Sequence, residues 1–172
     1  VSSSVIEAAP VRVRAGDHVD LTACVEALVG LGYERVDLVE RRGQVAVRGG
    51  IVDVFPPSEE HAVRIEFWGD DVEEIRHFSV TDQRSLDLLE HGLLAPAVRE
   101  LLLTDGVKAK ARELAIGAPG IAEMCQKIAA GIPVEGMESL TALLDTSMVS
   151  LVDLLPRGTQ IVVSEPERVA AR

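Results

Sequence analysis

The 172-residue chain carries 28 acidic and 17 basic side chains, and its formal net charge of −11 disfavours independent binding to a phosphate backbone. Hydrophobic residues make up 47% and charged residues 26%, which is a globular composition, but aromatic residues reach only 3%, so the core must be aliphatic. Apolar runs are too short to span a membrane, and neither the widely separated Cys24 and Cys125 nor the scattered histidines form a metal or disulfide pattern. We therefore expect a cytoplasmic protein with no membrane contact, and the initial Val1 indicates a piece of a longer chain.

The first hundred residues predict one helix packed on a small antiparallel sheet. Residues 1–16 form an extended lead-in, and a helix capped by Asp17 or Asp20 follows and ends near Gly30. From Tyr33 onward the hydrophobic pattern has the period of two that is typical of half-buried strands. We predict strands near residues 34–40, 45–48, 50–55, 62–68, 72–79 and 85–90.

Short turns separate these predicted strands. The sequences Arg42-Gly43-Gln44 and Gly69-Asp70-Asp71 predict hairpins, and Pro56-Pro57-Ser58-Glu59 predicts a rigid turn. Short strands joined in this way form antiparallel sheets, whose uncovered face is exposed to solvent.

The fourth of these strands, residues 62–68, alternates strictly and separates two kinds of side chain. The side chains on one face are apolar and pack the core: Val63, Ile65 and Phe67. Those on the other face are Arg64, Glu66 and Trp68, which is the single tryptophan of the chain. Arginine and tryptophan are enriched among the residues that dominate binding energy, so this face predicts a docking surface.

After Pro96 the periodicity becomes helical. We predict helices over residues 104–115, 121–131 and 137–144. The apolar run Ile161–Val163 then predicts a buried, parallel strand. Because a buried strand needs neighbours to pair with, the second half predicts an incomplete α/β unit.

The sequence contains no motif that supports catalysis. It has no phosphate-binding G-x-x-x-x-G-K-[ST] loop, no dinucleotide fingerprint, no G-x-S-x-G elbow and no H-E-x-x-H pair. At the end of the predicted last strand stand Ser164 and Glu165, where magnesium coordination would need an aspartate. We therefore predict a degenerate nucleotide-binding strand, with no catalytic residue, metal or cofactor in this chain.

Several motifs resemble the second domain of the UvrB family of nucleotide-excision-repair proteins, and equally the corresponding region of the transcription-repair coupling factors (Mfd). These motifs are Tyr33-Glu34-Arg35, Arg42-Gly43, Val47-Arg48-Gly49, Ile51-Val-Asp-Val-Phe-Pro56 and Val63-Arg-Ile-Glu-Phe-Trp-Gly-Asp70. Three later motifs are similar to the segment that returns into the first domain of those proteins: Gly136-Met-Glu-Ser139, Leu151-Val-Asp-Leu-Leu-Pro156 and Ile161-Val-Val-Ser-Glu165.

Two positions favour the coupling-factor family over UvrB. The sequence Ser164-Glu165-Pro166 departs from the acidic motif with which the last strand of UvrB ends, and the amino-terminal region of the coupling factors has lost ATP binding. Ala46 stands where UvrB tends to carry a second arginine. The corresponding domain of UvrB is the alternative.

The resemblance implies a lead-in over residues 1–16, a UvrB-like domain 2 over 17–100 and part of domain 1b over 101–172. In both families domain 2 docks UvrA, the damage-sensing ATPase of excision repair. Carried over residue by residue, the UvrA-binding positions are Arg35, Arg48, Arg64, Glu66, Phe67 and Trp68.

The full-length coupling factors are ATP-dependent DNA translocases that displace stalled RNA polymerase and then recruit UvrA. The resemblance therefore implies that ATP and magnesium belong to motor domains absent from this chain, and that DNA and RNA polymerase bind through other domains. It also implies that the carboxy-terminal domain covers the docking surface in the resting state, so a structural or autoinhibitory role is a further alternative.

A purely structural role for the same residues also stays open. Arg48 and Arg64 can pair locally with Asp53 or Glu66, and Trp68 can cover an edge of the core. Alternation across the two glycines that follow Arg48 does not settle whether its side chain shares the face of Arg64.

Overall fold

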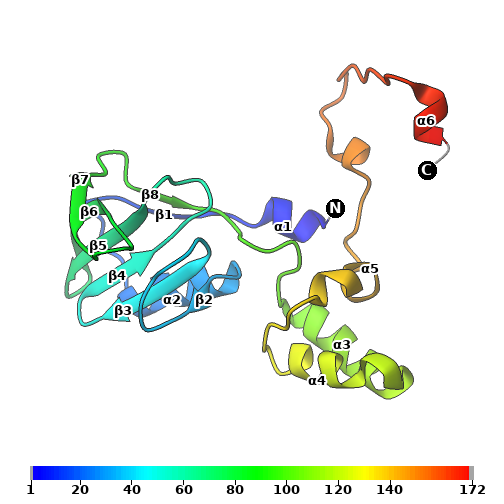
Figure 1. The fold of residues 1–172 in the computed structure, drawn as a ribbon, viewed down its shortest axis with the longest axis horizontal. Helices are drawn as coiled ribbons and strands as arrows, with labels where there is room; N and C mark the ends of the chain where they lie inside the picture. Colours follow the sequence, from blue (N-terminus) through cyan, green and yellow to red (C-terminus); the bar gives the residue numbers. More distant parts are fainter. Residues whose placement is uncertain (1, 171–172) are drawn as a thin grey trace.

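The computed structural model describes residues 2–170, and within them a six-stranded sheet and a two-stranded ribbon form the first half of the chain (Figure 1). The strands of the sheet lie in the order β2-β3-β4-β5-β6-β7, so neighbours in sequence are neighbours in space. Their bounds are β2 (Glu34–Arg35), β3 (Gln44–Arg48), β4 (Ile51–Val54), β5 (Ala62–Trp68), β6 (Asp71–Phe78) and β7 (Ser85–Leu88). The ribbon pairs β1 (Val11–Val13) with β8 (Leu93–Ala95).

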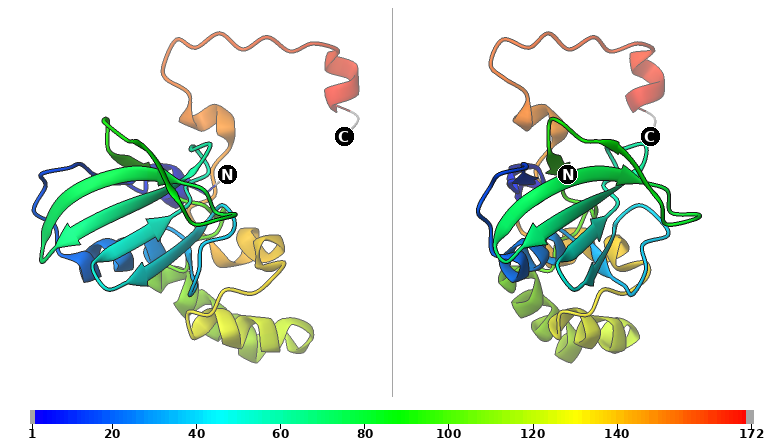
Figure 2. Two further views of the ribbon diagram at one scale, coloured as in Figure 1. Left: turned by 60° about the vertical axis from the view of Figure 1, so that its left-hand side comes forward. Right: turned by 90° about the vertical axis from the view of Figure 1, so that its left-hand side faces the viewer.

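Helix α2 (Leu21–Gly30) lies against one face of the sheet (Figure 2). Of the two predicted caps, Asp17 and Asp20, it is Asp20 that caps the helix, by accepting a hydrogen bond from the backbone N–H of Ala23. At the other end the N–H of Tyr33 donates to the carbonyl of Leu28, which needs the positive φ of Gly32, a conformation that glycine adopts at little cost.

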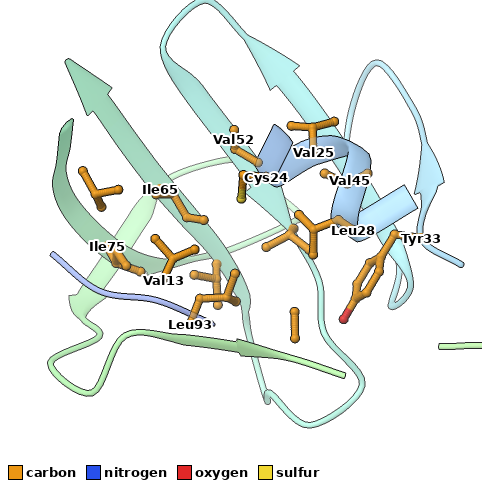
Figure 3. Packing of buried hydrophobic residues seen from close by; sticks show 14 of the residues in the cluster. Val13, Cys24, Val25, Leu28, Tyr33, Val45, Val52, Ile65, Ile75 and Leu93 are labelled. Atoms are coloured by element: carbon orange, nitrogen blue, oxygen red, sulfur yellow. The ribbon is translucent and has the colours of Figure 1, made fainter. Parts of the chain in front are cut away.

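The main hydrophobic core lies between α2 and the sheet. Val25 and Leu28 of the helix meet Val45, Val52 and other side chains of the strands, as Figure 3 shows. The three apolar side chains predicted to face inward on β5 are all buried here: Val63, Ile65 and Phe67. The predicted α+β fold, a helix on a small sheet, is confirmed.

The first strand differs from the prediction. We expected a hairpin at residues 42–44, but β2 pairs with β3 in parallel and is two residues long. Beyond it the chain bends away, because Val39 is buried in a second cluster on the opposite face of the sheet. The side-chain carbonyl of Gln44 accepts hydrogen bonds from the N–H groups of Glu40 and Arg41 and stabilises this loop. The sheet is therefore mixed at one edge.

The predicted extended lead-in also contains regular structure. Helix α1 (Ser3–Glu7) is capped by Ser2 and is followed by β1. The Ser2 hydroxyl donates to the carboxylate of Asp145, and Ser3 donates its N–H to the carbonyl of Ser147 over 3.2 Å. The start of the described chain is thus bonded to the second half. The predicted domain limits stay a prediction, and their outer ends, residues 1 and 171–172, lie outside the described residues.

The second half begins as a small helical unit with its own hydrophobic cluster. Thr104 caps the first helix by accepting a bond from the N–H of Val107, as predicted. The α-helices are α3 (Asp105–Gly117), α4 (Ala122–Ala129) and α5 (Thr141–Leu144), and the 3₁₀ turns are η1 (Pro119–Ile121) and η2 (Met137–Leu140).

The last segment corrects the predicted buried strand. It contains the short η3 (Leu151–Leu154) and α6 (Pro166–Ala170) and extends away from the rest of the protein (Figure 1). Ile161–Val163 is not a strand, and Val162 is 91% exposed. A parallel strand gains its backbone hydrogen bonds only from a neighbouring strand, and no strand of residues 2–170 lies beside residues 161–163. Ser164 and Glu165 accordingly lie in an exposed turn, where Glu165 pairs with Arg168 at 2.6 Å.

Candidate docking face of the sheet

The strand register arranges the side chains of the face opposite α2 in rows. One row crosses β3 to β6 through Ala46, Asp53, Arg64 and Arg76. The next row crosses the same strands through Arg48, Ile51, Glu66 and Glu74. Side chains two positions apart in a strand point the same way, so all these side chains share one face. Arg48 therefore lies on the same face as Arg64, which the sequence pattern leaves undecided.

Asp53 is the centre of this face and is only 1% exposed. Its carboxylate accepts two hydrogen bonds from Arg64, from Nε at 2.7 Å and from Nη2 at 2.9 Å. It also accepts one from Nη2 of Arg48 at 2.6 Å. A buried carboxylate without such partners would be costly, and two-point guanidinium contacts are among the strong hydrogen bonds of proteins.

Arg64 is mostly buried, and its side chain is 11% exposed. Its Nη1 donates to the carbonyl of Gln83 over 3.3 Å, and its guanidinium carbon lies 4.6 Å from the centre of the Phe78 ring. The hydrogen bond to Asp53 raises the pKa of the Arg64 guanidinium above its ordinary value, against the opposing effect of burial. The local pairing that the sequence left open is thus present, and Arg64 is largely an internal residue.

Arg48 differs from Arg64 because its side chain is 45% exposed. It touches Asp53 through a single nitrogen, Nη2. The half-buried Glu66 lies one strand beyond Ile51 in the same row, so this face carries a negative as well as a positive charge.

Trp68 is the last residue of β5 and is 75% exposed. It does not cover an edge of the core, which excludes one structural alternative. The turn that follows is stabilised by the segment before α2: the N–H of Val19 donates to the carbonyl of Asp70 over 2.7 Å, and His18 Nδ1 lies 2.8 Å from a carboxylate oxygen of Asp71. The contact with Asp71 raises the pKa of His18. The indole therefore projects from a well-supported turn.

Two predicted residues do not join this face. Phe67 is buried in the main core beneath it, on the α2 side. Arg35 is aligned with Val45 in the parallel β2–β3 pair, and Val45 also points to the α2 side. The structure therefore brings together Arg48, Arg64, Glu66 and Trp68 and leaves the other two elsewhere.

Sequence reasoning missed part of the arrangement. It treated Asp53 as one possible local partner and gave no role to Phe78 or Gln83, which pack against Arg64. One signal was available for Asp53, because it is the single polar residue inside the apolar run Ile51–Val54. The contact with Phe78 depends on the register of β6 beside β5, and the contact with Gln83 depends on the path of the loop between β6 and β7; local sequence patterns contain neither.

No cluster of three histidine, cysteine, aspartate or glutamate side chains in residues 2–170 is arranged to hold a metal ion. The helices in the same range are also too short or too polar to cross a membrane.

The face lies within a stretch that matches a known family. The family described as "UvrB interaction domain" matches residues 11–99. The transcription-repair-coupling factor of Mycobacterium bovis is 46% identical over 95% of this chain, and that of Myxococcus xanthus is 35% identical over 95%. UvrABC system protein B of Geobacillus kaustophilus is 39% identical over 51% of this chain. These alignments cover only 14%, 15% and 13% of the three relatives. Because the family match spans β1 to β8 and the whole sheet, this chain belongs to the UvrB interaction domain family.

Proposed function

We propose that this chain is a non-catalytic docking module of a transcription-repair coupling factor, and that it binds UvrA during nucleotide excision repair. The observation that carries the proposal is the exposed indole of Trp68 on the same face as the partly exposed guanidinium of Arg48. The relatives named as coupling factors and as UvrABC system protein B support the biological setting.

The physical argument for docking is the cost of leaving such groups in water. A tryptophan that is three-quarters exposed leaves a large apolar surface hydrated, and burial of that surface by a partner is favourable. Tryptophan and arginine anchors often contribute about 2 kcal/mol or more each to a protein interface. Because Arg48 on β3 and Trp68 on β5 extend from one sheet, with only β4 between their strands, little backbone reorganisation is needed on binding.

We propose the following roles for the longer protein of which this chain is a part. UvrA is recruited to lesions where RNA polymerase has stalled, while an ATP-driven DNA translocase, its magnesium and the contacts with DNA and polymerase belong to other domains. A contact of this face with the carboxy-terminal domain regulates its access. This chain itself carries none of those activities.

The test is a binding titration of the 172-residue chain with purified UvrA. We expect a complex that elutes as one species in gel filtration at micromolar concentration and that weakens as salt is added, because charged groups lie on the face. The Arg157→Ala variant, which changes an exposed arginine of the last segment, is the matched control and should bind like the unchanged chain. Absence of co-elution would contradict the proposal, and hydrolysis of ATP by the chain alone would favour an enzyme instead.

A further inference from the structure

We propose that Asp53 is a positioning residue of the docking face, which holds the guanidinium of Arg48 so that its remaining N–H groups bind a carboxylate of the partner. This inference rests on the proposed function, because it names the atoms of the face that meet UvrA. Asp53 is almost fully buried and has no surface with which to touch a partner. It acts through Arg48.

Arg48 and Arg64 use their hydrogen-bond donors differently. A guanidinium has five N–H groups on three nitrogens. Arg64 uses all three nitrogens inside the protein, two on Asp53 and one on the carbonyl of Gln83. Arg48 uses only Nη2, and within residues 2–170 its Nε and Nη1 have no acceptor. Of the two arginines bound to Asp53, Arg48 is therefore the one with an edge left for a partner.

The side chain of Arg48 is already held in place before a partner binds. A solvated arginine loses much side-chain entropy when a partner immobilises it. Arg48 is already held by a 2.6 Å charge-assisted bond to a carboxylate that two bonds from Arg64 keep in place. Nη2 carries two N–H groups, and because the guanidinium is planar, a bond from one of them to Asp53 also orients the other. That second N–H, together with Nη1 or Nε, forms an edge that matches the two oxygens of a carboxylate.

Arg48 is also accessible to a partner and carries a positive charge. Arg48 is followed by Gly49 and Gly50, which have no side chains to cover it. The N–H of Phe67 donates to the carbonyl of Gly50 over 2.7 Å, so this turn lies beside the residue that precedes Trp68. Within the Arg48–Asp53 pair the guanidinium is partly exposed and the carboxylate is buried, so the surface that this pair presents to a partner is positive, in a chain of net charge −11. An acidic group of the partner therefore fits this position, next to the surface that the indole contacts.

A double-mutant cycle with UvrA tests the inference. Binding is titrated for the unchanged chain, Asp53→Asn, Arg48→Ala and the double variant. We expect Asp53→Asn to weaken binding at least fivefold when Arg48 is present and less than twofold when it is alanine. If Asp53 only supports the fold, its replacement will weaken binding equally in both backgrounds, and the inference is overturned.

A second variant keeps the test decisive if Asp53→Asn does not fold. Arg48→Lys retains the positive charge but cannot hold Asp53 and a partner carboxylate with two edges of one plane. We expect at least a fivefold loss of affinity with an unchanged melting temperature, whereas Arg157→Lys should bind normally. Unaltered affinity of Arg48→Lys would overturn the inference. Failure of the unchanged chain to bind UvrA would instead overturn the proposed function, and this inference with it.

Discussion

Arg64 and Asp53 form a two-point ion pair across neighbouring strands, with nitrogen–oxygen distances of 2.7 and 2.9 Å and almost no contact with solvent. The alternation of residues 62–68 alone predicts an outward-facing Arg64 whose removal leaves the fold intact. The observed burial changes that expectation, because a buried charge that loses a partner is strongly destabilising.

We therefore expect Arg64→Ala to lower the free energy of unfolding by about 3 kcal/mol, which is the lower end of the range for breaking a buried pair because Arg48 still contacts Asp53. Urea unfolding followed by circular dichroism measures this change. Arg48→Ala is the comparison, and it should cost only about 0–1 kcal/mol because its side chain is half exposed. Equal stability of the two variants would contradict the assigned roles.

Trp68→Ala should affect binding and not stability. The side chain has little core contact to lose, so the melting temperature should stay the same, while affinity for UvrA should fall at least tenfold, or about 1.4 kcal/mol. Calorimetric titration measures the affinity. Ile116→Ala, at an 88% exposed position of α3, is the matched control for loss of exposed apolar surface and should leave both quantities unchanged. A Trp68→Ala protein with full affinity would show that the indole is not an anchor.

Ile65→Ala should affect stability first. Ile65 is fully buried in the main core, so its truncation removes apolar contacts and leaves a cavity, at a cost of about 2–5 kcal/mol. Truncation of the exposed Val162 to alanine, which removes a smaller apolar group, should change the free energy of unfolding by less than about 0.5 kcal/mol. Denaturant midpoints of Ile65→Ala and Val162→Ala provide the comparison, and similar midpoints would place Ile65 outside the core.

The contact between His18 and Asp71 predicts a pH dependence. The hydrogen bond to Asp71 raises the pKa of His18 above its ordinary value of 6.5, so the folded state binds the proton more tightly than the unfolded chain. The stabilisation is therefore complete below about pH 6.5 and disappears as the pH rises through the higher pKa of the folded state.

Proton NMR of the His18 ring measures this titration directly. We expect a pKa above 6.5 in the unchanged chain and a lower one in Asp71→Asn, which removes the charge of the partner. An unchanged His18 titration in Asp71→Asn would contradict the contact.

Local patterns in the sequence determined most of the elements. The cap at Asp20 and the alternation of residues 62–68 follow from hydrogen-bonding and burial requirements that act within a few residues, so helix α2 and strand β5 are confirmed. The prediction was wrong where pairing depends on distant partners. The edge strand β2 became parallel because Val39 is buried away from it, and residues 161–163 found no strand to join.

The composition of the docking face was likewise visible in the sequence, because the period of a strand alone places Arg64, Glu66 and Trp68 on one side. The different roles of the residues within that face were not visible in the sequence. Only the tertiary structure decided that Arg64 is enclosed by Asp53, Phe78 and Gln83 while Arg48 stays partly free. The reason is physical: alternation determines the direction of a side chain, but its burial and hydrogen bonds depend on which strands and loops the register brings beside it.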